Sequence, residues 1–178
     1  VCAHLKAEGA ELLLSPNGSP FERGKHDKRC AHAHARVGET GLPLVYVNQF
    51  GGQDELVFDG GSFVMAGDGE IAVQGAVWSS DIMMTDWHCG DGVWACASQT
   101  TATAPDDLAQ IYQAAMLGLR DYVNKNGFPG VLLGLSGGID SAICAAMAVD
   151  ALGADHVHAV MLPSRYTSQS SLDDASAC

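Results

Sequence analysis

A turn rich in glycine and serine carries the residue types and spacing best suited to chemistry in this sequence. It reads Gly134, Leu135, Ser136, Gly137, Gly138, Ile139, Asp140 and Ser141. Two adjacent glycines let a backbone come close to a ligand, in conformations that a Cβ would forbid. A helix that starts at this turn would direct free N–H groups and its positive dipole end into the same space. The pattern therefore predicts a site for an anion held largely by backbone groups.

The acidic residue in the turn narrows the kind of anion. Asp140 would repel a bare phosphate, and this conflict disappears if its carboxylate holds a metal ion that accompanies the phosphate. Ser136 and Ser141 add a hydroxyl donor near each end of the loop. The sequence therefore predicts a polyphosphate bound together with Mg²⁺.

Other interpretations of the same turn fit the sequence less well. A Walker-A loop needs a lysine that is missing here, and the G-x-G-x-x-G spacing of a dinucleotide site is also missing. Gly134–Gly138 does satisfy the G-x-S-x-G pattern of a hydrolase nucleophile elbow. That hydrolase needs an acid and then a histidine, and Asp150 or Asp155 before His156 or His158 comes too early in the chain. We favour the polyphosphate interpretation over the elbow and over a purely structural turn.

The elements around the turn predict a βαβ unit. Pro105 suits the first position of a helix, and the acids after it suit the positive dipole end of its N-terminus. Apolar residues then keep helical spacing, and Gly127 ends the helix. A strand over 131–133, a helix over 139–152 and a strand over 156–162 follow. Two strands joined by a helix predict a parallel sheet.

The first half of the chain reads as short strands between Gly- and Asp-rich turns. We expect a helix end at 1–5, a strand at 12–14, a loop at 15–18, a helix at 22–40 closed by Gly41, and a buried strand at 44–47. Further strands are expected near 55–58, 62–65 and 70–75, with hairpin turns at 59–61 and 67–69. Periodicity is lost over 79–104, which is read as a connector.

Composition limits the class of protein. The 178 residues include 47% hydrophobic residues and a net charge of −12, from 9 Lys and Arg against 21 Asp and Glu. This acidity argues against a nucleic-acid partner, which requires a basic face. No apolar run approaches the roughly 20 residues that span a bilayer, and no signal peptide is visible, so no membrane partner is expected. Six scattered cysteines suit a reduced, cytoplasmic setting.

Four stretches resemble a known family. Ser136–Ser141 resembles the pyrophosphatase loop of ATP-using synthetases and amidotransferases that release AMP. Met161–Ser168 resembles the segment after the second strand of NAD synthetases. Ser15–Glu22 and Val47–Gly60 resemble the nitrilase-type glutaminase domain that precedes such a synthetase. Together these segments resemble the glutamine-dependent NAD⁺ synthetases.

The resemblance implies an α/β fold in two partial domains. Residues 1–80 would form the C-terminal part of a nitrilase-like αββα sandwich, the carbon-nitrogen hydrolase or glutaminase domain. Residues 81–104 would be a connector. Residues 105–178 would form the first βαβ of a doubly wound parallel-sheet ATP-pyrophosphatase domain, the NAD synthetase part.

The resemblance also implies a reaction. Glutamine would supply ammonia, and ATP would adenylate deamido-NAD⁺, with release of pyrophosphate and then AMP as NAD⁺ forms. The ATP-binding residues would be Gly134, Leu135, Ser136, Gly137, Gly138, Ile139, Asp140 and Ser141, with Mg²⁺ on Asp140. Ser19 and Lys25 match positions that hold glutamine, although an ordinary solvated charge explains Lys25 equally well. The complete protein is expected to be a homo-oligomer.

The sequence departs from the family pattern at its start. The Glu, Lys and Cys of the family's glutaminase precede the segment that corresponds to Val1, and Cys2 resembles a non-catalytic position. We therefore expect an internal fragment with no catalytic residue of its own, no glutaminase activity, and deamido-NAD⁺ contacts beyond Cys178. A GMP-synthetase-type amidotransferase and a non-catalytic ATP-binding remnant are the alternatives. A zinc site among His26, Cys30 and the histidines that follow is a further, less favoured one.

Overall fold

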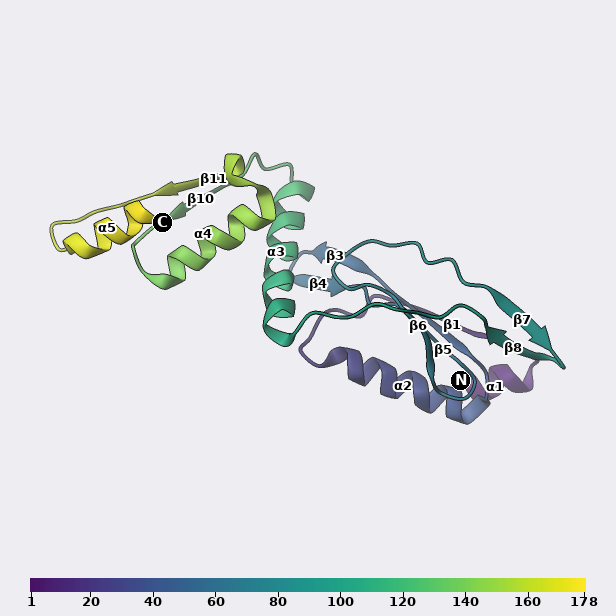
Figure 1. Ribbon diagram of the computed structural model, residues 1–178. Helices are drawn as coiled ribbons and strands as arrows, with labels where there is room; N and C mark the ends of the chain where they lie inside the picture. Colours follow the sequence, from purple (N-terminus) through teal and green to yellow (C-terminus); the bar gives the residue numbers. More distant parts are fainter. The chain divides into compact units, whose positions relative to one another are not determined.

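The computed structural model describes all residues from Val1 to Cys178 and contains two compact units (Figure 1). Unit 1 comprises Val1–Gly51 and Leu56–Gln110. Unit 2 comprises Gly52–Glu55 and Ile111–Cys178. No helix of the chain has the length and apolar character needed to span a membrane.

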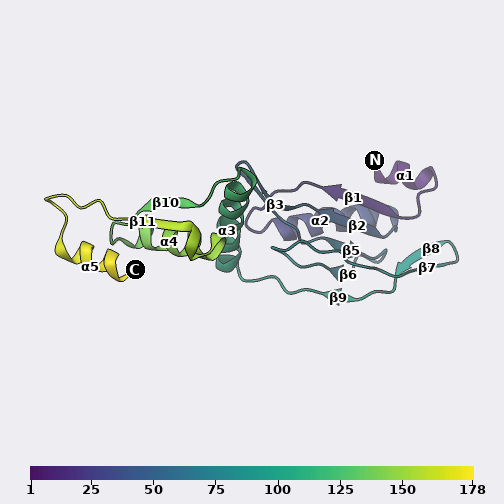
Figure 2. The ribbon, with the colours of Figure 1, turned by 90° about the horizontal axis from the view of Figure 1, so that it is seen from above.

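Unit 1 is built on a mixed sheet of five strands, which is seen from above in Figure 2. The strands lie in the order β1 (Leu13–Asn17), β2 (Leu44–Asn48), β5 (Phe63–Met65), β6 (Ile71–Gln74) and β9 (Thr100–Thr101). β1 runs parallel to β2 and β6 parallel to β9, whereas β5 is antiparallel to both of its neighbours. The predicted strands near 44–47, 62–65 and 70–75 are confirmed as members of this sheet.

Helix α2 (Lys25–Thr40) supplies the other half of the unit's core. Its buried Ala33 and Val37 join a cluster with residues of the sheet, namely Leu13, Leu44, Phe63 and Met65. The helix ends as predicted at Gly41, which has a φ of 65° and donates its N–H to the carbonyl of Val37. The predicted start at Glu22 is wrong, because Gly24 takes a left-handed φ of 71° and the helix begins only after it. A short helix, α1 (Cys2–Ala7), confirms the helical reading of the first residues.

The loop predicted at 15–18 is wrong, because most of this segment belongs to a strand. Its first three residues are the second half of β1, in which Pro16 lies opposite Val47. Proline has no N–H to donate to a ladder, so a strand tolerates it best at the edge of a sheet. β1 is such an edge strand, since it pairs only with β2.

One of the two predicted hairpin turns is confirmed and the other is wrong. The turn at 67–69 joins β5 to its antiparallel partner β6, and Gly69 has a φ of 91°. The turn at 59–61 does not join paired strands, because β4 (Leu56–Asp59) pairs with β3 (Phe50–Gln53) in a sheet of two strands. β3 was not predicted. Gly60 and Gly61 instead redirect the chain with φ values of 72° and 66°.

The segment read as an irregular connector contains regular structure. β7 (Trp87–Gly90) and β8 (Val93–Cys96) form an antiparallel hairpin, and β9 joins the five-stranded sheet. Asp91 and Gly92 both have positive φ values, 51° and 74°, as a type I′ turn requires. The Asp-Gly pair was a visible hairpin signal, and the flanking residues hid it because they alternate poorly.

Unit 2 contains the predicted βαβ unit. β10 (Val131–Gly134) and β11 (Val157–Val160) are parallel, with Val131 opposite Val157, and α4 (Ile139–Leu152) connects them through the short helix η1 (Ala154–His156). α5 (Gln169–Ala177) follows β11, and Ser168 caps it by accepting the N–H of Ser171. The chain is therefore a mixed α/β fold.

Helix α3 (Asp107–Lys125) precedes β10. The sequence predicts Pro105 as the first residue of this helix, and that prediction is wrong. Asp106 instead accepts the N–H of Ala109 at 2.9 Å, so it caps the helix that begins after it. The predicted end is confirmed at Gly127, which has a φ of 69°.

Candidate functional site

The turn between β10 and α4 depends on glycine at one position above all. Gly137 has a φ of 79°, and an added Cβ would lie 2.2 Å from the carbonyl oxygen of Ser171. Both conditions exclude a side chain there. A Cβ at Gly138, in contrast, would meet only the Ser136 hydroxyl at 3.4 Å. The first glycine of the pair thus shapes the turn, and the second leaves room beside the start of α4.

The two serines of the turn hold each other. The Ser136 and Ser141 hydroxyl oxygens are 3.1 Å apart, and Ser141 also donates to the carbonyl of Gly138 at 2.9 Å. In return the N–H of Ser136 donates to the Ser141 hydroxyl at 3.2 Å, and the N–H of Gly138 to the Ser136 hydroxyl at 3.3 Å. The sequence had assigned these hydroxyls to the ligand. The structure uses them to close the turn, which leaves the first N–H groups of α4 as the donors that face outward.

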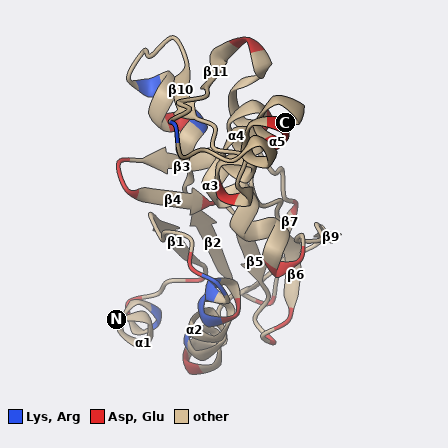
Figure 3. Ribbon diagram, turned by 90° about the vertical axis from the view of Figure 1, so that its left-hand side faces the viewer, with Lys and Arg blue, Asp and Glu red and all other residues tan.

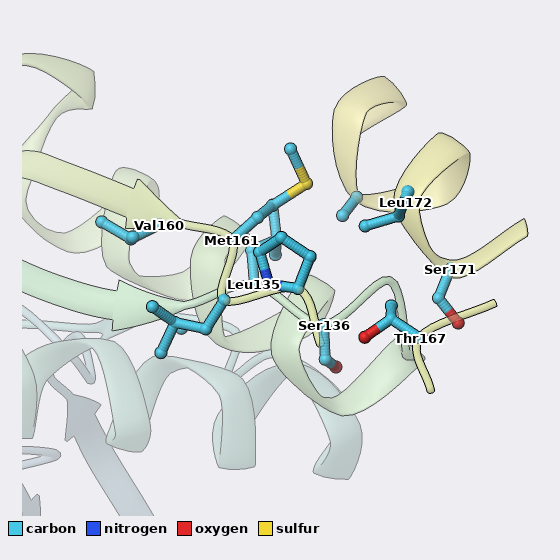
Figure 4. A pocket seen from close by; sticks show the side chains of 11 residues that line it. Leu135, Ser136, Val160, Met161, Thr167, Ser171 and Leu172 are labelled. Atoms are coloured by element: carbon cyan, nitrogen blue, oxygen red, sulfur yellow. The ribbon is translucent and has the colours of Figure 1, made fainter. Parts of the chain in front are cut away.

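A pocket of about 310 Å³ opens beside the turn, at the carboxyl ends of β10 and β11. In open α/β sheets this is the edge at which ligands bind. Figure 4 shows Ser136, Thr167 and Ser171 together on one side and Leu135, Val160 and Met161 on the other. The pocket therefore offers a polar end next to the turn and an apolar wall formed largely by the strand ends.

Sequence reasoning missed the far wall of this pocket. This wall is formed by α5 and the loop before it, through Thr167, Ser171, Leu172 and Ala175. Thr167 is held in place, because its hydroxyl accepts the N–H of Ser164 at 2.9 Å. The available signal was positional, since residues that follow a parallel strand gather at the same sheet edge as those that follow its neighbour.

Asp140 lies in the first turn of α4 and is exposed to solvent. It does not line the pocket, and the chain contains no cluster of three or more His, Cys, Asp or Glu residues that could hold a metal ion. Mg²⁺ usually keeps several waters and binds through one or two carboxylates plus substrate phosphates. An exposed single carboxylate at a helix start beside a glycine-rich turn fits that kind of binding.

The hydrolase alternative lacks its base in the structure. The Ser136 hydroxyl contacts the Ser141 hydroxyl and the N–H of Gly138, and no histidine reaches it. The Nδ1 of His156 instead lies 2.8 Å from the carbonyl oxygen of Pro129. A nucleophilic serine needs a base within hydrogen-bond reach, so the turn does not form a nucleophile elbow.

The two residues assigned to glutamine lie in unit 1 and line one pocket of about 490 Å³ beside α2. Ser19 follows β1, and its N–H donates to the Asn48 side chain at 2.9 Å. Lys25 is the first residue of α2, and its ammonium pairs with Glu22 at 3.0 Å. The structure thus brings Ser19 and Lys25 to the same pocket.

A buried ion pair contains Arg29, which also lines this pocket. The Arg29 guanidinium makes two hydrogen bonds of 2.9 Å to the carboxylate of Asp59, and both side chains are at most 4% exposed. Arg29 also donates to the hydroxyl of Ser19 at 3.2 Å and to its carbonyl at 2.8 Å. Asn48 donates to the carbonyls of Ser19 and Gly60. These contacts fix the Ser19 loop. They could not be predicted from the sequence, because the partners lie 10 to 30 residues apart.

Figure 3 shows basic and acidic residues together on α2, and the basic residues are paired with acids. Lys25 and Lys28 both pair with Glu22, and their hydrogen bonds hold its pKa down at about 2. Burial raises the pKa of the Cys30 thiol, whose sulfur lies 3.4 Å from Nε2 of His26. A thiol with a raised pKa is a poor nucleophile, which leaves Cys30 as a packing residue.

Comparison with known proteins gives the family. The family model described as carbon-nitrogen hydrolase matches residues 1–91, and the one described as NAD synthase matches residues 111–178. The glutamine-dependent NAD⁺ synthetase of Rhodobacter capsulatus is 54% identical over 98% of this chain and 32% of its own length. The chain belongs to the glutamine-dependent NAD⁺ synthetase family. The family predicted from the four sequence stretches is confirmed.

Other members agree in sequence and in fold. The glutamine-dependent NAD⁺ synthetase of Xylella fastidiosa strain Temecula1 is 47% identical over 93% of this chain and 30% of its own length. A solved structure of the enzyme from Acinetobacter baumannii, in complex with adenosine diphosphate, matches with a TM-score of 0.87 and 44% identity. The match covers 97% of this chain and 32% of that one. The chain thus spans about a third of the length of the curated relatives it matches.

Proposed function

We propose that the protein amidates deamido-NAD⁺ to NAD⁺ in an ATP-dependent reaction that uses ammonia from glutamine. The turn at Gly137 carries this proposal. It lies at the carboxyl end of β10, it excludes a side chain, and it leads into α4 with free N–H groups beside a pocket. The relative from Acinetobacter baumannii, whose structure holds ADP, supports a nucleotide as the ligand.

Adenylation suits such a turn. The nicotinate carboxylate attacks the α-phosphorus of ATP, the bond to pyrophosphate breaks, and ammonia then displaces AMP from the acyl adenylate. Donors placed where pyrophosphate leaves stabilise the charge that develops there. Asp140 would hold Mg²⁺, which neutralises phosphate charge when bound.

The ATP assignment covers the whole turn, whose residues contribute in several ways. Ser136, Gly137 and Ser141 keep the turn closed through the contacts described above. Ile139 and Asp140 begin α4, where backbone N–H groups face the ligand, and Gly138 leaves room beside them. Gly134 and Leu135 line the pocket. The apolar wall, which includes Val160 and Met161, suits an aromatic base.

Glutamine would bind at the pocket lined by Ser19 and Lys25. The Lys25 ammonium complements the α-carboxylate of the amino acid, and Ser19 offers a hydroxyl whose position Arg29 fixes. No described residue is assigned as the nucleophile. Homo-oligomerisation of the full-length protein remains a prediction from the family resemblance.

The test uses purified full-length protein with Mg-ATP and glutamine, and measures AMP formation with either deamido-NAD⁺ or xanthosine monophosphate as acceptor. We expect AMP only with deamido-NAD⁺. AMP formed only with xanthosine monophosphate would identify a GMP-synthetase-type enzyme. Binding of Mg-ATP that is lost in Asp140→Ala, without turnover of either acceptor, would identify an ATP-binding remnant.

A further inference from the structure

A backbone segment of the hydrolase-like part is held by a helix of the synthase-like part. Unit 2 consists of Ile111–Cys178 together with Gly52–Glu55, the tip of the β3–β4 hairpin. This tip belongs to the residues that match the carbon-nitrogen hydrolase model, whereas α3 from Ile111 onward matches the NAD synthase model. The tip is therefore the place where a segment of one family module is part of the compact unit of the other.

Asp121 of α3 is the centre of this attachment. Its carboxylate accepts the N–H of Gly52 at 2.7 Å and lies 3.6 Å from the ammonium of Lys125, which in turn donates to the Gly52 carbonyl. The second carboxylate oxygen accepts from Arg120 at 3.2 Å. The Asp121 side chain is only 16% exposed, so both polar groups of the Gly52 backbone are held in a largely shielded position.

Gly52 fits this position because it has no side chain. An added Cβ would lie 3.1 Å from the Cβ of Asp121 and 3.3 Å from the backbone of Gly118 and Leu117. The φ of Gly52 is not in the left-handed region, so space and not conformation requires a glycine here. Helix and hairpin tip are thus in direct backbone contact.

From Gly52 the chain leads directly to the ion pair beside the proposed glutamine pocket. The tip continues into β4, and β4 ends at Asp59, the partner of Arg29. Arg29 holds the hydroxyl and the carbonyl of Ser19. A shift of the tip on α3 would therefore be passed along one short strand to the ion pair that places Ser19.

α3 is also joined to the element that carries the nucleotide turn. The Tyr112 hydroxyl donates to the carboxylate of Asp150 at 2.7 Å, which ties α3 to α4. This hydrogen bond to Asp150 raises the pKa of Tyr112. α4 begins directly after Gly138, so α3 contacts elements that lead to both proposed sites.

We propose that Asp121 is a positioning residue that couples glutamine hydrolysis to amidation, by fixing the hairpin tip at Gly52 to α3. The inference rests on the proposed function, because coupling has meaning only if both reactions occur. Loss of the attachment leaves each chemical step possible and removes the connection between them. Coupling free energies in proteins are typically about 1–3 kcal/mol, which corresponds to changes of about fivefold or more.

The experiment measures glutamate and NAD⁺ formed by full-length wild-type protein, Asp121→Ala, Gly52→Ala and the control Gly38→Ala. A Cβ at Gly38 would meet nothing within 4 Å, and its φ is ordinary, so it matches the Gly52 change without the contact. We expect glutamate formed per NAD⁺ to rise at least about fivefold in both tip variants and to stay at the wild-type value in the control. The rate with added ammonia in place of glutamine should change less than about twofold, because the synthetase step itself is intact.

Three results would count against the inference. An unchanged ratio of glutamate to NAD⁺ in Gly52→Ala shows that the attachment couples nothing. A parallel loss of the ammonia-supported rate shows a structural role only. Asp121→Asn keeps an oxygen that accepts the Gly52 N–H, so it should restore most of the coupling lost in Asp121→Ala; failure to do so also counts against the proposal. Wild-type protein that forms no NAD⁺ would refute the proposed function instead.

Discussion

The turn at Gly134–Ser141 and the loop around Ser19 are both shaped to bind small molecules, and they are built in opposite ways. The turn is held by neighbours in the chain: two serines five residues apart and a glycine with a left-handed φ. The Ser19 loop is held from a distance by Arg29, which is itself bound to Asp59. A local device of this kind depends on backbone geometry, whereas the remote one depends on a buried charge pair.

The difference has a consequence for robustness. The turn loses its shape if a single Cβ is added, but the energy at stake is local strain of about 1–3 kcal/mol. The Ser19 loop depends instead on two ions that are expensive to bury unless each keeps its partner. Substitutions at the two sites test whether one depends on backbone geometry and the other on a buried charge pair.

The largest effect is expected at the buried ion pair. Arg29→Met should lower the free energy of unfolding by about 3–5 kcal/mol, because it leaves the Asp59 carboxylate buried without its partner. The measurement is urea denaturation of the full-length protein, with Arg36→Met on the same helix as control. Arg36 pairs with Glu39 at the surface, where a pair contributes at most about 1 kcal/mol. Equal losses in the two variants would show that the Arg29–Asp59 pair does not support the loop.

The next effect is expected at the turn. Gly137→Ala should weaken ATP binding at least about tenfold, because strain at a φ of 79° and a contact of 2.2 Å with the Ser171 carbonyl move the turn. Isothermal calorimetry with Mg-ATP measures this change.

A change at Gly134, the glycine that precedes Gly137 in the turn, tests whether the backbone of Gly137 has a special role. Gly134→Ala places its Cβ in open space, so the free energy of unfolding should change by less than about 0.5 kcal/mol. If Gly134→Ala destabilises the protein as much as Gly137→Ala does, the special role of the Gly137 backbone is contradicted.

A smaller effect is expected when the serine pair is broken. Ser141→Ala removes the donor to the Gly138 carbonyl and the acceptor for the Ser136 N–H. A lost hydrogen bond of this kind costs about 1 kcal/mol, which corresponds to about a fivefold weaker affinity for ATP. Ser141→Thr keeps the hydroxyl and should restore the affinity. Equal affinity in the wild type and Ser141→Ala would show that the pair does not hold the turn.

The smallest effect is expected from the exposed carboxylate next to Lys25. Hydrogen bonds from Lys28 and Lys25 lower the pKa of Glu22 from its ordinary 4.5 to about 2. A lowered carboxyl pKa stabilises the folded state above pH 4.5, and this stabilisation is lost as the pH falls toward 2. Solvent screens the group, so we expect a small change in stability. NMR titration of the Glu22 carboxyl should give the lowered pKa and a higher one in Lys28→Ala; an ordinary pKa in the wild type would contradict the pairing.

The same contrast explains what could be predicted from sequence. The ends of α2 and α3 at Gly41 and Gly127, and the βαβ unit around Gly137, follow from residues that are close together in the chain. The pairing of Arg29 with Asp59 and the contact between Gly52 and Asp121 join residues that are 30 and 69 positions apart. The type of a single residue, such as an arginine or a glycine, does not indicate which distant residue it contacts.

Some local signals were also outweighed. Pro16 indicated a loop, but an edge strand accepts it because the missing N–H faces away from the ladder. Asp91 and Gly92 carried a hairpin signal that their irregular flanks obscured. Pairing with β2 decided the first segment, and the local pairing of β7 with β8 decided the second.

The most direct test of the central claim follows the nitrogen. Full-length protein is supplied with Mg-ATP, deamido-NAD⁺ and glutamine labelled with ¹⁵N in the side-chain amide, and the products are analysed by mass spectrometry. The account predicts NAD⁺ that carries the ¹⁵N label, with AMP and pyrophosphate formed in equal amounts. Unlabelled NAD⁺, ADP and phosphate in place of AMP and pyrophosphate, or no NAD⁺ at all would contradict it.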